Sequence, residues 1–471
     1  MPEETALTTS VLKATTPLAR PAHWGHDAIF YHVYPLGMLG APQRNDFRAA
    51  PTARLRQLEQ WIPHWQALGI NALYVGPLFE STTHGYDTVD YFQVDRRLGT
   101  NADFAALTRA LHAAGIRVIV DAVYNHVGRD HFAFQDVRKH GQASRYCDWI
   151  AGLRFDKRSP CGDPFTYDTW HGAYELVKLD LKNPEVRDYL LQATAAWMQE
   201  FDLDGLRLDA ADCLDEGFLR ALSTFCRARK PDFWLMGEIV FGDYTKWANP
   251  DMLDTTTNYD AYKGLYSSHN DRNYFEIAHT FERQFGAKGL YNGLSLYNFV
   301  DNHDVNRIAT QLKHKAHLVP LHVLLFTMPG APAIYYGSEF AVPGKKAPTS
   351  DVPLRPALPL PAAPHELATL IGRLAQLRQG LAPLRRGTYV PLHVANEQFA
   401  FARCLPMESV VVAVNAAAAP ATLALTLPMW QDGWLVDVLN PGERFEVRQG
   451  RVVLTDVPAN GGRVLVPQLR I

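Results

Sequence analysis

Three acidic residues stand directly after short apolar runs, where they could do chemistry together. Asp209 follows the run GLRL, Glu238 ends FWLMGE, and Asp304 ends LYNFVDNHD. Cleavage of a glycosidic bond needs one protonated carboxylic acid and one ionised carboxylate. The guanidinium of Arg207, two residues before Asp209, favours the ionised form of that carboxyl group and predicts a nucleophile there. Glu238 has no basic neighbour in the sequence, which predicts the proton donor.

Other polar side chains follow apolar runs in the same way. They are His84, Tyr86, Asp87, Asp121, Asn125, His126, Asp301 and His303. Taken singly, an acid at such a position is more often a helix cap, and Arg-x-Asp is more often a structural ion pair. Their repetition at successive run ends instead predicts one shared site.

The apolar runs alternate with amphipathic helices along most of the chain. This pattern is typical of a parallel sheet covered by helices. About eight such strands fit a (β/α)8 TIM barrel, an α/β fold in which the carboxyl ends of the strands meet at one rim. An open doubly wound sheet is the alternative, and the absence of a G-x-G-x-x-G turn in the sequence argues against it.

Changes in pattern predict the domain boundaries. The expected parts are a tail at 1–24, a catalytic barrel at 25–126 and 181–385, an inserted domain B after the third strand at 127–180, and a C-terminal antiparallel β-sandwich domain at 386–471. The insertion is polar, aromatic and irregular, whereas short alternating strands such as SVVVAVN characterise the last part.

Composition excludes several classes of function. The 471 residues carry a formal net charge of −3, which gives no basic surface for nucleic acid. No apolar run is long enough to span a bilayer, and the first residues lack the apolar segment of a signal peptide, so a cytoplasmic protein is expected. The five cysteines form no CxxC pair, which disfavours a disulfide framework or a zinc site.

Several segments together resemble the α-amylase family of glycoside hydrolases, family 13. DAVYNH, GLRLDAADC, GEIV and FVDNHD are similar, in this order, to its first four sequence regions, and LVKLDLKNPEV is similar to its fifth. The likeness extends from about residue 25 to the end of the chain. It implies a (β/α)8 barrel with a domain B and a domain C, and a retaining mechanism on α-glucans.

The resemblance also implies a role for each matching residue. Asp209 would be the nucleophile, Glu238 the general acid/base, and Asp304 the residue that binds sugar hydroxyls and stabilises the transition state. The substrate-binding residues would be Tyr86, which stacks under the sugar, Asp87, His126, Arg207, which orients Asp209 with Asp121 as its partner, and His303. Arg355 is a candidate partner for Asp87 in gripping a terminal sugar.

Two departures from the family pattern bear on the expectations. Asp212 and Cys213 stand where many α-amylases have a Lys-His pair that binds sugar on the leaving-group side. Lys178 stands where many members have a calcium ligand, as in the neopullulanase and cyclomaltodextrinase branch. We therefore expect no cofactor and no metal. Only about 25 residues precede the barrel, which leaves no room for the dimerising domain of that branch and predicts a monomer or a weak homo-oligomer.

The sequence thus predicts a hydrolase of α-1,4 links in maltooligosaccharides and soluble dextrins. One alternative is a cyclomaltodextrinase, a neopullulanase or an α-glucan transglycosylase that uses the same residues. A second alternative is a non-catalytic sugar-binding member of the fold. The presence of Asp209, Glu238 and Asp304 argues against this second alternative.

Overall fold

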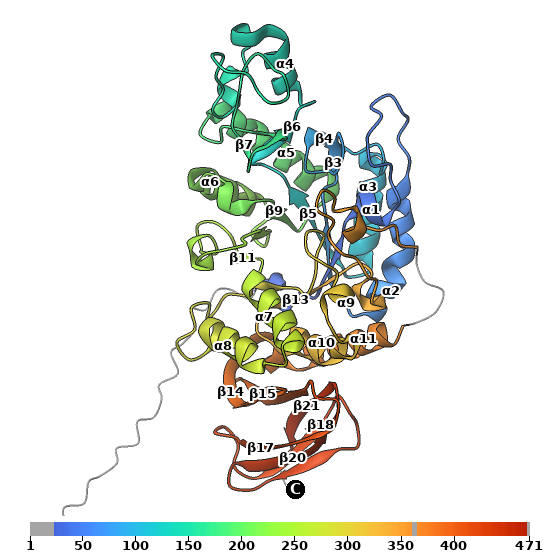
Figure 1. The fold of residues 1–471 in the computed structure, drawn as a ribbon, viewed down its shortest axis with the longest axis vertical. Helices are drawn as coiled ribbons and strands as arrows, with labels where there is room; N and C mark the ends of the chain where they lie inside the picture. The colour runs from blue at the N-terminus through green and yellow to red at the C-terminus, as the bar shows by residue number, and fades with distance from the viewer. Residues whose placement is uncertain (1–22, 360–364, 469–471) are drawn as a thin grey trace, which may run out of the picture.

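The computed structural model describes residues 23–359 and 365–468. The predicted tail lies outside the described residues as far as residue 22, and the short 3-10 helix η1 (Trp24–Asp27) follows it. No helix in the described part of the chain is both long and apolar enough to cross a membrane. Figure 1 shows three layers along the longest axis, with the barrel between a top excursion that contains α4 and a bottom sheet domain.

Eight parallel strands form the barrel. They are β1 (Phe30–Val33), β2 (Ala72–Val75), β5 (Arg117–Ala122), β9 (Gly205–Leu208), β10 (Trp234–Gly237), β11 (Thr255–Thr256), β12 (Tyr297–Asn298) and β13 (Ala331–Tyr335). They pair in the order β11-β10-β9-β5-β2-β1-β13-β12, and a parallel bridge from Thr257 to Tyr297 closes the ring. The predicted α/β barrel is confirmed. Barrel strands that follow one another along the chain also lie side by side in the ring.

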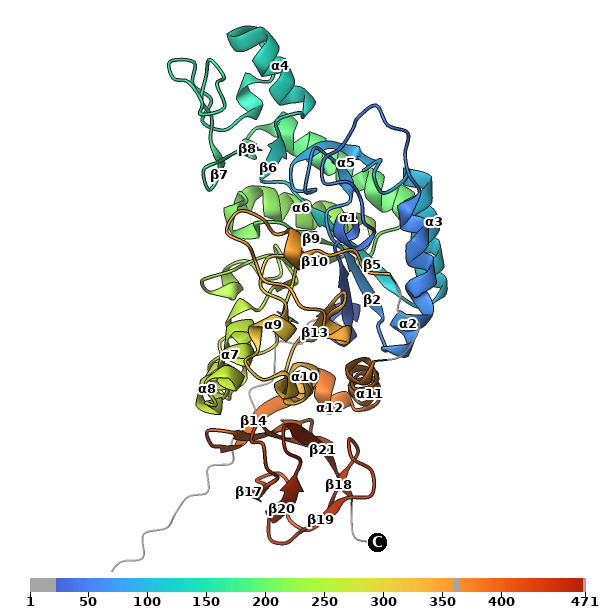
Figure 2. The same cartoon turned by 45° about the vertical axis from the view of Figure 1, so that its right-hand side comes forward.

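Helices cover the outside of this ring. They are α1 (Pro35–Met38), η2 (Arg54–Trp61), α2 (Ile62–Ala67), α3 (Asn101–Ala113), α5 (Pro184–Phe201), α6 (Glu216–Arg229), α7 (Tyr259–Asn270), α8 (Tyr274–Phe285), α9 (Ile308–Gln311), α10 (Leu318–Thr327), α11 (Glu366–Gly380) and α12 (Ala382–Arg386). In Figure 2, α2 and α3 lie outside β2 and β5.

Local sequence fixes where these helices begin. Thr100 caps α3 through a reciprocal capping box with Asp103. Asn183 caps α5, and Pro184 occupies its first turn. These caps direct each helix back along the barrel after its strand.

The sequence pattern misses β11 entirely. Its two residues, Thr255 and Thr256, are polar and lie in the segment DTTTNYD, which has no apolar run. The strand forms because β10 provides a paired neighbour, with Met236 beside Thr255. Tertiary pairing therefore decides this strand, since local preference does not.

Two excursions rise from the carboxyl ends of the strands. The antiparallel pair β3 (Phe79–Ser81) and β4 (Thr88–Val94) carries Tyr86 and Asp87 in its connecting loop. A second excursion contains β6 (His126–Gly128), α4 (Phe132–His140), the 3-10 turns η3 (Gly141–Ala143) and η4 (Cys147–Trp149), β7 (Thr169–Trp170) and β8 (Ala173–Lys178). Its strands pair in the order β6-β8-β7 and bring the irregular segment back over the barrel rim.

An antiparallel domain follows α12. It contains β14 (Thr388–Val394), β15 (Gln398–Cys404), β16 (Ser409–Asn415), β17 (Ala421–Thr426), β18 (Gly433–Asp437), β19 (Arg444–Val447), β20 (Arg451–Val457) and β21 (Gly461–Gln468). Six of these strands pair as β14-β15-β16-β21-β18-β19, and β17 pairs with β20. Buried residues such as Leu425 and Leu454 fill the core of this domain.

Two buried arginines bind carbonyl groups around the end of α10, and one of them, Arg403, joins the last domain to the barrel. Arg403 of β15 donates from Nη1 to the carbonyl oxygens of Thr327 (2.7 Å) and Leu384 (2.9 Å). Arg378 of α11 donates to the carbonyl oxygens of Phe326 (3.0 Å) and Leu384 (2.9 Å). The carbonyl groups at the end of α10 are thereby paired, since a helix leaves its last carbonyls without partners of its own.

Asp204, at the start of β9, holds that strand in register. Its Oδ2 accepts hydrogen bonds from the backbone N–H of Val118 (2.9 Å) and from Nε2 of His112 (2.7 Å), and its Oδ1 lies 3.0 Å from Nζ of Lys230. Burial raises the pKa of Asp204, but these hydrogen bonds outweigh it and bring the pKa down to about 2. The ionised carboxylate thus fixes the strand that carries Arg207 to the rim.

Candidate active site

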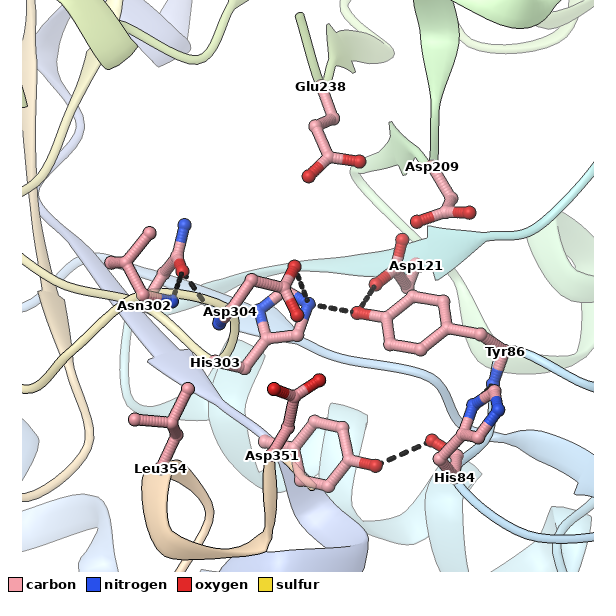
Figure 3. Close-up of polar contacts among 12 residues, drawn as sticks. His84, Tyr86, Asp121, Asp209, Glu238, Asn302, His303, Asp304, Asp351 and Leu354 are labelled. Atoms are coloured by element: carbon pink, nitrogen blue, oxygen red, sulfur yellow. Dashed lines mark hydrogen bonds and ion pairs between the residues drawn. The ribbon is translucent and has the colours of Figure 1, made fainter. Parts of the chain in front are cut away.

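The predicted acids gather at the carboxyl ends of neighbouring strands. Asp209 directly follows β9, Glu238 directly follows β10, and Asp304 lies in the loop after β12. Asp121 occupies the last part of β5, beside Arg207 in the strand register. Figure 3 shows Asp209 and Glu238 on one side of this cluster, with Asp304 between them and Asp351.

The guanidinium of Arg207 holds three carboxylates at once. Its Nη1 lies 2.7 Å from Oδ1 of Asp121 and 2.9 Å from Oδ1 of Asp209, and its Nη2 lies 2.9 Å from Oε2 of Glu238. Glu238 has no basic neighbour in the sequence, but in the structure Arg207 is its basic neighbour. Parallel pairing places Met236 beside Arg207, and the side chain two residues further on reaches the same guanidinium.

Burial dominates the protonation of Asp209. It raises the pKa of Asp209 well above its usual range, and the carboxylates of Glu238, Asp121 and Asp304 raise it further, whereas Arg207 lowers it. The sequence predicts that Arg207 keeps Asp209 ionised, whereas the net effect of the surroundings is to raise the pKa of Asp209. Burial and the neighbouring carboxylates thus outweigh the single guanidinium at Asp209.

Asp304 is held in the opposite state. Burial raises its pKa, but His303 and Arg355 lower it far below the usual range. Oδ2 of Asp304 lies 3.0 Å from Nε2 of His303, and Oδ1 lies 2.9 Å from Nη2 of Arg355. The cluster therefore places Asp304, whose pKa is lowered, near Asp209, whose pKa is raised.

Tyr86 connects these two parts of the cluster. Its hydroxyl donates to Oδ2 of Asp121 (3.0 Å) and contacts Nε2 of His303, and its ring is stacked with the His303 ring at 5.4 Å between centroids. The hydroxyl of Tyr74 donates to the same Oδ2 of Asp121 at 2.8 Å. These contacts fix the aromatic ring in the floor of the site, where it can face a sugar ring.

His126 points a free ring nitrogen toward Asp209. Its Nε2 lies 4.0 Å from Oδ2 of Asp209 and, among the described residues, has no hydrogen-bond partner. Burial lowers the pKa of His126 to about 3, so the ring is neutral. A neutral imidazole nitrogen at this position can bond to a sugar hydroxyl group.

Ala210 joins the two acids through the backbone. It has a left-handed conformation with φ of 43°, which is uncommon for a residue with a side chain. In this conformation its N–H donates to Oε2 of Glu238 at 3.1 Å. Strained backbone of this kind clusters at functional sites, because the surroundings must compensate for its cost.

The structure corrects the expected partner of Asp87. Asp87 accepts a hydrogen bond from Thr83 Oγ1 at 2.7 Å. Arg355 instead forms ion pairs with Asp304 and Asp351. Arg355 also lies over the ring of Tyr34, at 4.5 Å from its centroid. The arginine that the sequence offers for a terminal sugar thus supports Asp304.

A cavity of about 920 Å³ opens above these residues. Besides the acids, its walls include residues that sequence reasoning missed: Tyr34, Trp170, Leu176, Tyr259, Lys346 and Asp351. The hydroxyl of Tyr259 lies 3.4 Å from Oε1 of Glu238. Tyr259 follows the missed strand β11, so recognising that strand would have placed it at the rim.

The departure at Asp212 and Cys213 lies in the short helix η5 (Ala211–Cys213). Asp212 is exposed and Cys213 is half-buried, and burial raises the pKa of the Cys213 thiol to about 11. Neither residue is part of the cavity wall described above.

The residues present do not fit the calcium ion of many α-amylases. Oδ1 of Asn125 is buried without a hydrogen-bond partner among the described residues, and so offers one oxygen ligand. Lys178, however, pairs with His126 across β6 and β8, and it brings a positive charge to this sheet. In residues 23–359 and 365–468, no three His, Cys, Asp or Glu side chains are placed together to hold a metal. The expectation of no metal stays a prediction.

Removal of metal is therefore expected to leave the enzyme active. After incubation with EDTA and gel filtration, kcat and the unfolding temperature should stay within measurement error, because Lys178 stands in the sequence where many family members have a calcium ligand and the described residues contain no group of His, Cys, Asp or Glu that could hold a metal. Glucan hydrolysis and thermal unfolding before and after treatment check this. Loss of activity that added calcium restores would contradict it.

Comparison with known proteins agrees with this geometry. Residues 54–355 match the family model described as alpha amylase, catalytic domain. A cyclomaltodextrinase of Bacillus sp. is 32% identical over 417 residues, which cover 84% of this chain and 74% of that protein. Neopullulanase 2 of Thermoactinomyces vulgaris is 30% identical over 474 residues, which cover 95% of this chain and 78% of that protein.

A solved structure covers nearly the whole chain. The ligand-free cyclic α-maltosyl-(1→6)-maltose hydrolase of Arthrobacter globiformis is similar with a TM-score of 0.79 at 27% identity, and the match covers 95% of this chain and 100% of that chain. The fold and these relatives define the class of the protein, which is a glycoside hydrolase. The chain belongs to the α-amylase family, glycoside hydrolase family 13, and is similar to its neopullulanase and cyclomaltodextrinase branch. The resemblance in the sequence is confirmed.

Proposed function

We propose that this enzyme hydrolyses α-1,4-glucosidic bonds of maltooligosaccharides and soluble dextrins with retention of configuration. The observation that carries the proposal is the contact of one buried guanidinium, Arg207, with both Asp209 and Glu238. Adjacent strands thereby bring together the two carboxyl groups that a double displacement requires. Asp304 supplies the negative charge that stabilises an oxocarbenium-like transition state.

In the proposed first step, Asp209 attacks the anomeric carbon and Glu238 gives its proton to the departing glycosidic oxygen. In the second step, the ionised Glu238 takes a proton from water, whose oxygen attacks the same carbon and releases Asp209. Tyr86 stacks against the sugar in the cleaved position, and His126 and His303 bind its hydroxyl groups. Asp87 contacts the same sugar region from the β3–β4 loop.

The names of the relatives refer to cyclomaltodextrins, pullulan and a cyclic maltosyl-maltose, which supports a second candidate, a cyclomaltodextrinase or neopullulanase with the same residues. A cytoplasmic location is part of the proposal, supported by the name of the intracellular maltogenic amylase of Bacillus subtilis. We propose no nucleic-acid or membrane partner, and a monomer or weak homo-oligomer.

A time course on three glucans tests the proposal. Maltotriose, maltoheptaose and a cyclodextrin are digested separately, and products are followed by chromatography and proton NMR. We expect α-anomeric maltooligosaccharides and a higher kcat/KM on maltoheptaose than on the cyclodextrin. The opposite order would establish the cyclomaltodextrinase alternative, and products longer than the substrate would indicate transfer. A β-anomeric first product would exclude retention, and no hydrolysis of any of the three would favour a sugar-binding protein.

A further inference from the structure

His32 is a polar residue inside the barrel that has no role in the proposed mechanism. It lies in β1, and only 2% of it is exposed. Successive side chains of a strand point to opposite faces, so His32 shares its face with Phe30, which packs in the inner core of the barrel. A polar ring buried among apolar residues is stable only where its nitrogen atoms find hydrogen-bond partners.

Tyrosine rings of the two flanking strands hold His32 in place. Parallel pairing places His32 beside Tyr74 of β2 and Tyr335 of β13. The imidazole is stacked on the ring of Tyr74, with 4.0 Å between the centroids and 16° between the planes, and its centroid lies 4.9 Å from that of Tyr335. The hydroxyl of Tyr74 is fixed in turn by its hydrogen bond to Asp121. The imidazole of His32 therefore has a defined position in the barrel.

A third ring beside His32 belongs to His303. The two imidazoles are perpendicular, with 5.1 Å between their centroids. Each contains one buried nitrogen that has no hydrogen-bond partner among the described residues, namely Nε2 of His32 and Nδ1 of His303. A buried polar atom without a partner is costly, and an imidazole nitrogen can either donate or accept. These two nitrogens can satisfy each other, directly or through one water molecule.

The other ring nitrogen of His303 faces Asp304. Nε2 of His303 lies 3.0 Å from Oδ2 of Asp304 and contacts the hydroxyl of Tyr86 (Figure 3). That hydroxyl gives its own hydrogen to Asp121, and the carboxylate of Asp304 can only accept, so Nε2 of His303 carries a hydrogen. Rotation of the His303 ring would remove this donor from Asp304. A hydrogen bond at Nδ1 opposes such a rotation.

His32 stays neutral in this environment. Burial lowers the pKa of His32 well below its usual range, and the nearby His303 and Arg207 lower it further. A neutral imidazole keeps one N–H group and one acceptor nitrogen. His32 can therefore bond to Nδ1 of His303 whether that atom carries a hydrogen or a lone pair.

We propose that His32 is a positioning residue for the reaction, which pairs with Nδ1 of His303 and thereby keeps Nε2 of His303 directed at Asp304. The inference rests on the proposed function, in which Asp304 stabilises the transition state. Of these three described side chains, only Asp304 is part of the cavity wall, so His32 acts through His303 and does not touch the substrate. Loss of His32 should weaken binding of the transition state more than binding of the substrate, because Asp304 acts mainly in the transition state.

Substitutions of His32 test whether its nitrogen atoms matter or only its volume. We expect His32→Leu to lower kcat on maltotetraose about tenfold and to leave KM within about twofold of the wild-type value. The same loss should appear on α-maltosyl fluoride, because both substrates place the same sugar against Asp304. His32→Gln, whose amide can donate and accept, should retain kcat within about threefold of the wild type. His32→Met is a second apolar variant, which replaces His32→Leu if the latter does not fold.

A double-mutant cycle tests whether His32 acts through His303. In a His303→Ala background, His32→Leu should change kcat by no more than about twofold, because the group that His32 positions is already absent. His322→Leu is the matched control. His322 is fully buried in α10 and, like His32, has an Nε2 without a partner among the described residues. This control should leave kcat within about twofold of the wild type, since α10 does not contact the acids.

The outcomes separate this inference from the proposed function. An unchanged kcat in a folded Leu or Met variant would overturn the role of His32, and so would a Gln variant as impaired as the Leu variant. A further loss of about tenfold in the His303→Ala background would also overturn it, because His32 would then act independently of His303. A wild-type enzyme that hydrolyses neither substrate would instead overturn the proposed function.

Discussion

Replacement of Glu238 by glutamine is expected to lower kcat on maltotetraose by up to about 10⁴-fold, because the amide cannot protonate the departing oxygen. The loss on α-maltosyl fluoride should be much smaller in the first step, since fluoride leaves without a proton. The second step still lacks its base, so the glycosyl-enzyme should accumulate. Mass spectrometry of the quenched protein should then show a maltosyl adduct on the peptide that contains Asp209.

Glu216→Gln is the matched control for this variant. Glu216 begins α6 with a half-exposed carboxylate that pairs only loosely with Lys246, at 3.7 Å. Its rate should stay within about twofold of the wild type, because surface ion pairs contribute little. Equal activity of Glu238→Gln and the wild type on maltotetraose would remove Glu238 from the proposed mechanism, and an adduct on another peptide would remove Asp209.

Replacement of Arg207 by methionine is expected to impair both activity and stability. The substitution leaves the buried carboxyl groups of Asp121, Asp209 and Glu238 without their shared cation. Breaking a buried ion pair from one side costs about 3–5 kcal/mol of unfolding free energy. We also expect a loss of about 10²- to 10³-fold in kcat, since both acids lose their orientation. Denaturant unfolding and initial rates measure the two effects.

The stability loss should depend on pH in a defined direction. Without Arg207, burial and the neighbouring carboxylates hold the pKa of Asp209 still further above the unfolded value of about 4. The folded state then binds more protons than the unfolded state, so its stability falls as pH rises past that value. The deficit of the variant should thus be smaller at pH 5 than at pH 8. Arg220→Met, which removes an exposed pair with Asp251, is the control; a deficit independent of pH would contradict the account.

The sequence predicts the fold well because its apolar runs and caps are local signals. Seven of the eight barrel strands coincide with apolar runs, and Pro184 marks the start of α5. The strand β11 is invisible to this reasoning, since Thr255 and Thr256 acquire their strand conformation from pairing with β10. A strand of two polar residues carries no periodicity to recognise.

The candidate site also contains residues that the sequence predicts and contacts that it does not. The rim acids were predictable because each follows a strand, whereas their partners depend on register between strands and on long loops. Glu238 meets Arg207 because β9 and β10 lie side by side, and Arg355 reaches Asp304 from a loop 51 residues further along the chain. The sequence offers Arg355 only as a candidate partner of Asp87 and does not show that it binds Asp304.

The hydrogen bond from Arg403 to the end of α10 also bears on whether the C-terminal domain can be exchanged between related enzymes. Helix α10 ends just before β13, and Arg403, in the C-terminal sheet, supplies the donor for the carbonyl group of Thr327. The helix that leads into β13, the last strand of the barrel, therefore has its final carbonyl group paired by a residue of another domain. A C-terminal sheet without an arginine at this position would leave that carbonyl group without this donor, so a residue outside the catalytic rim bears on which domains can be recombined.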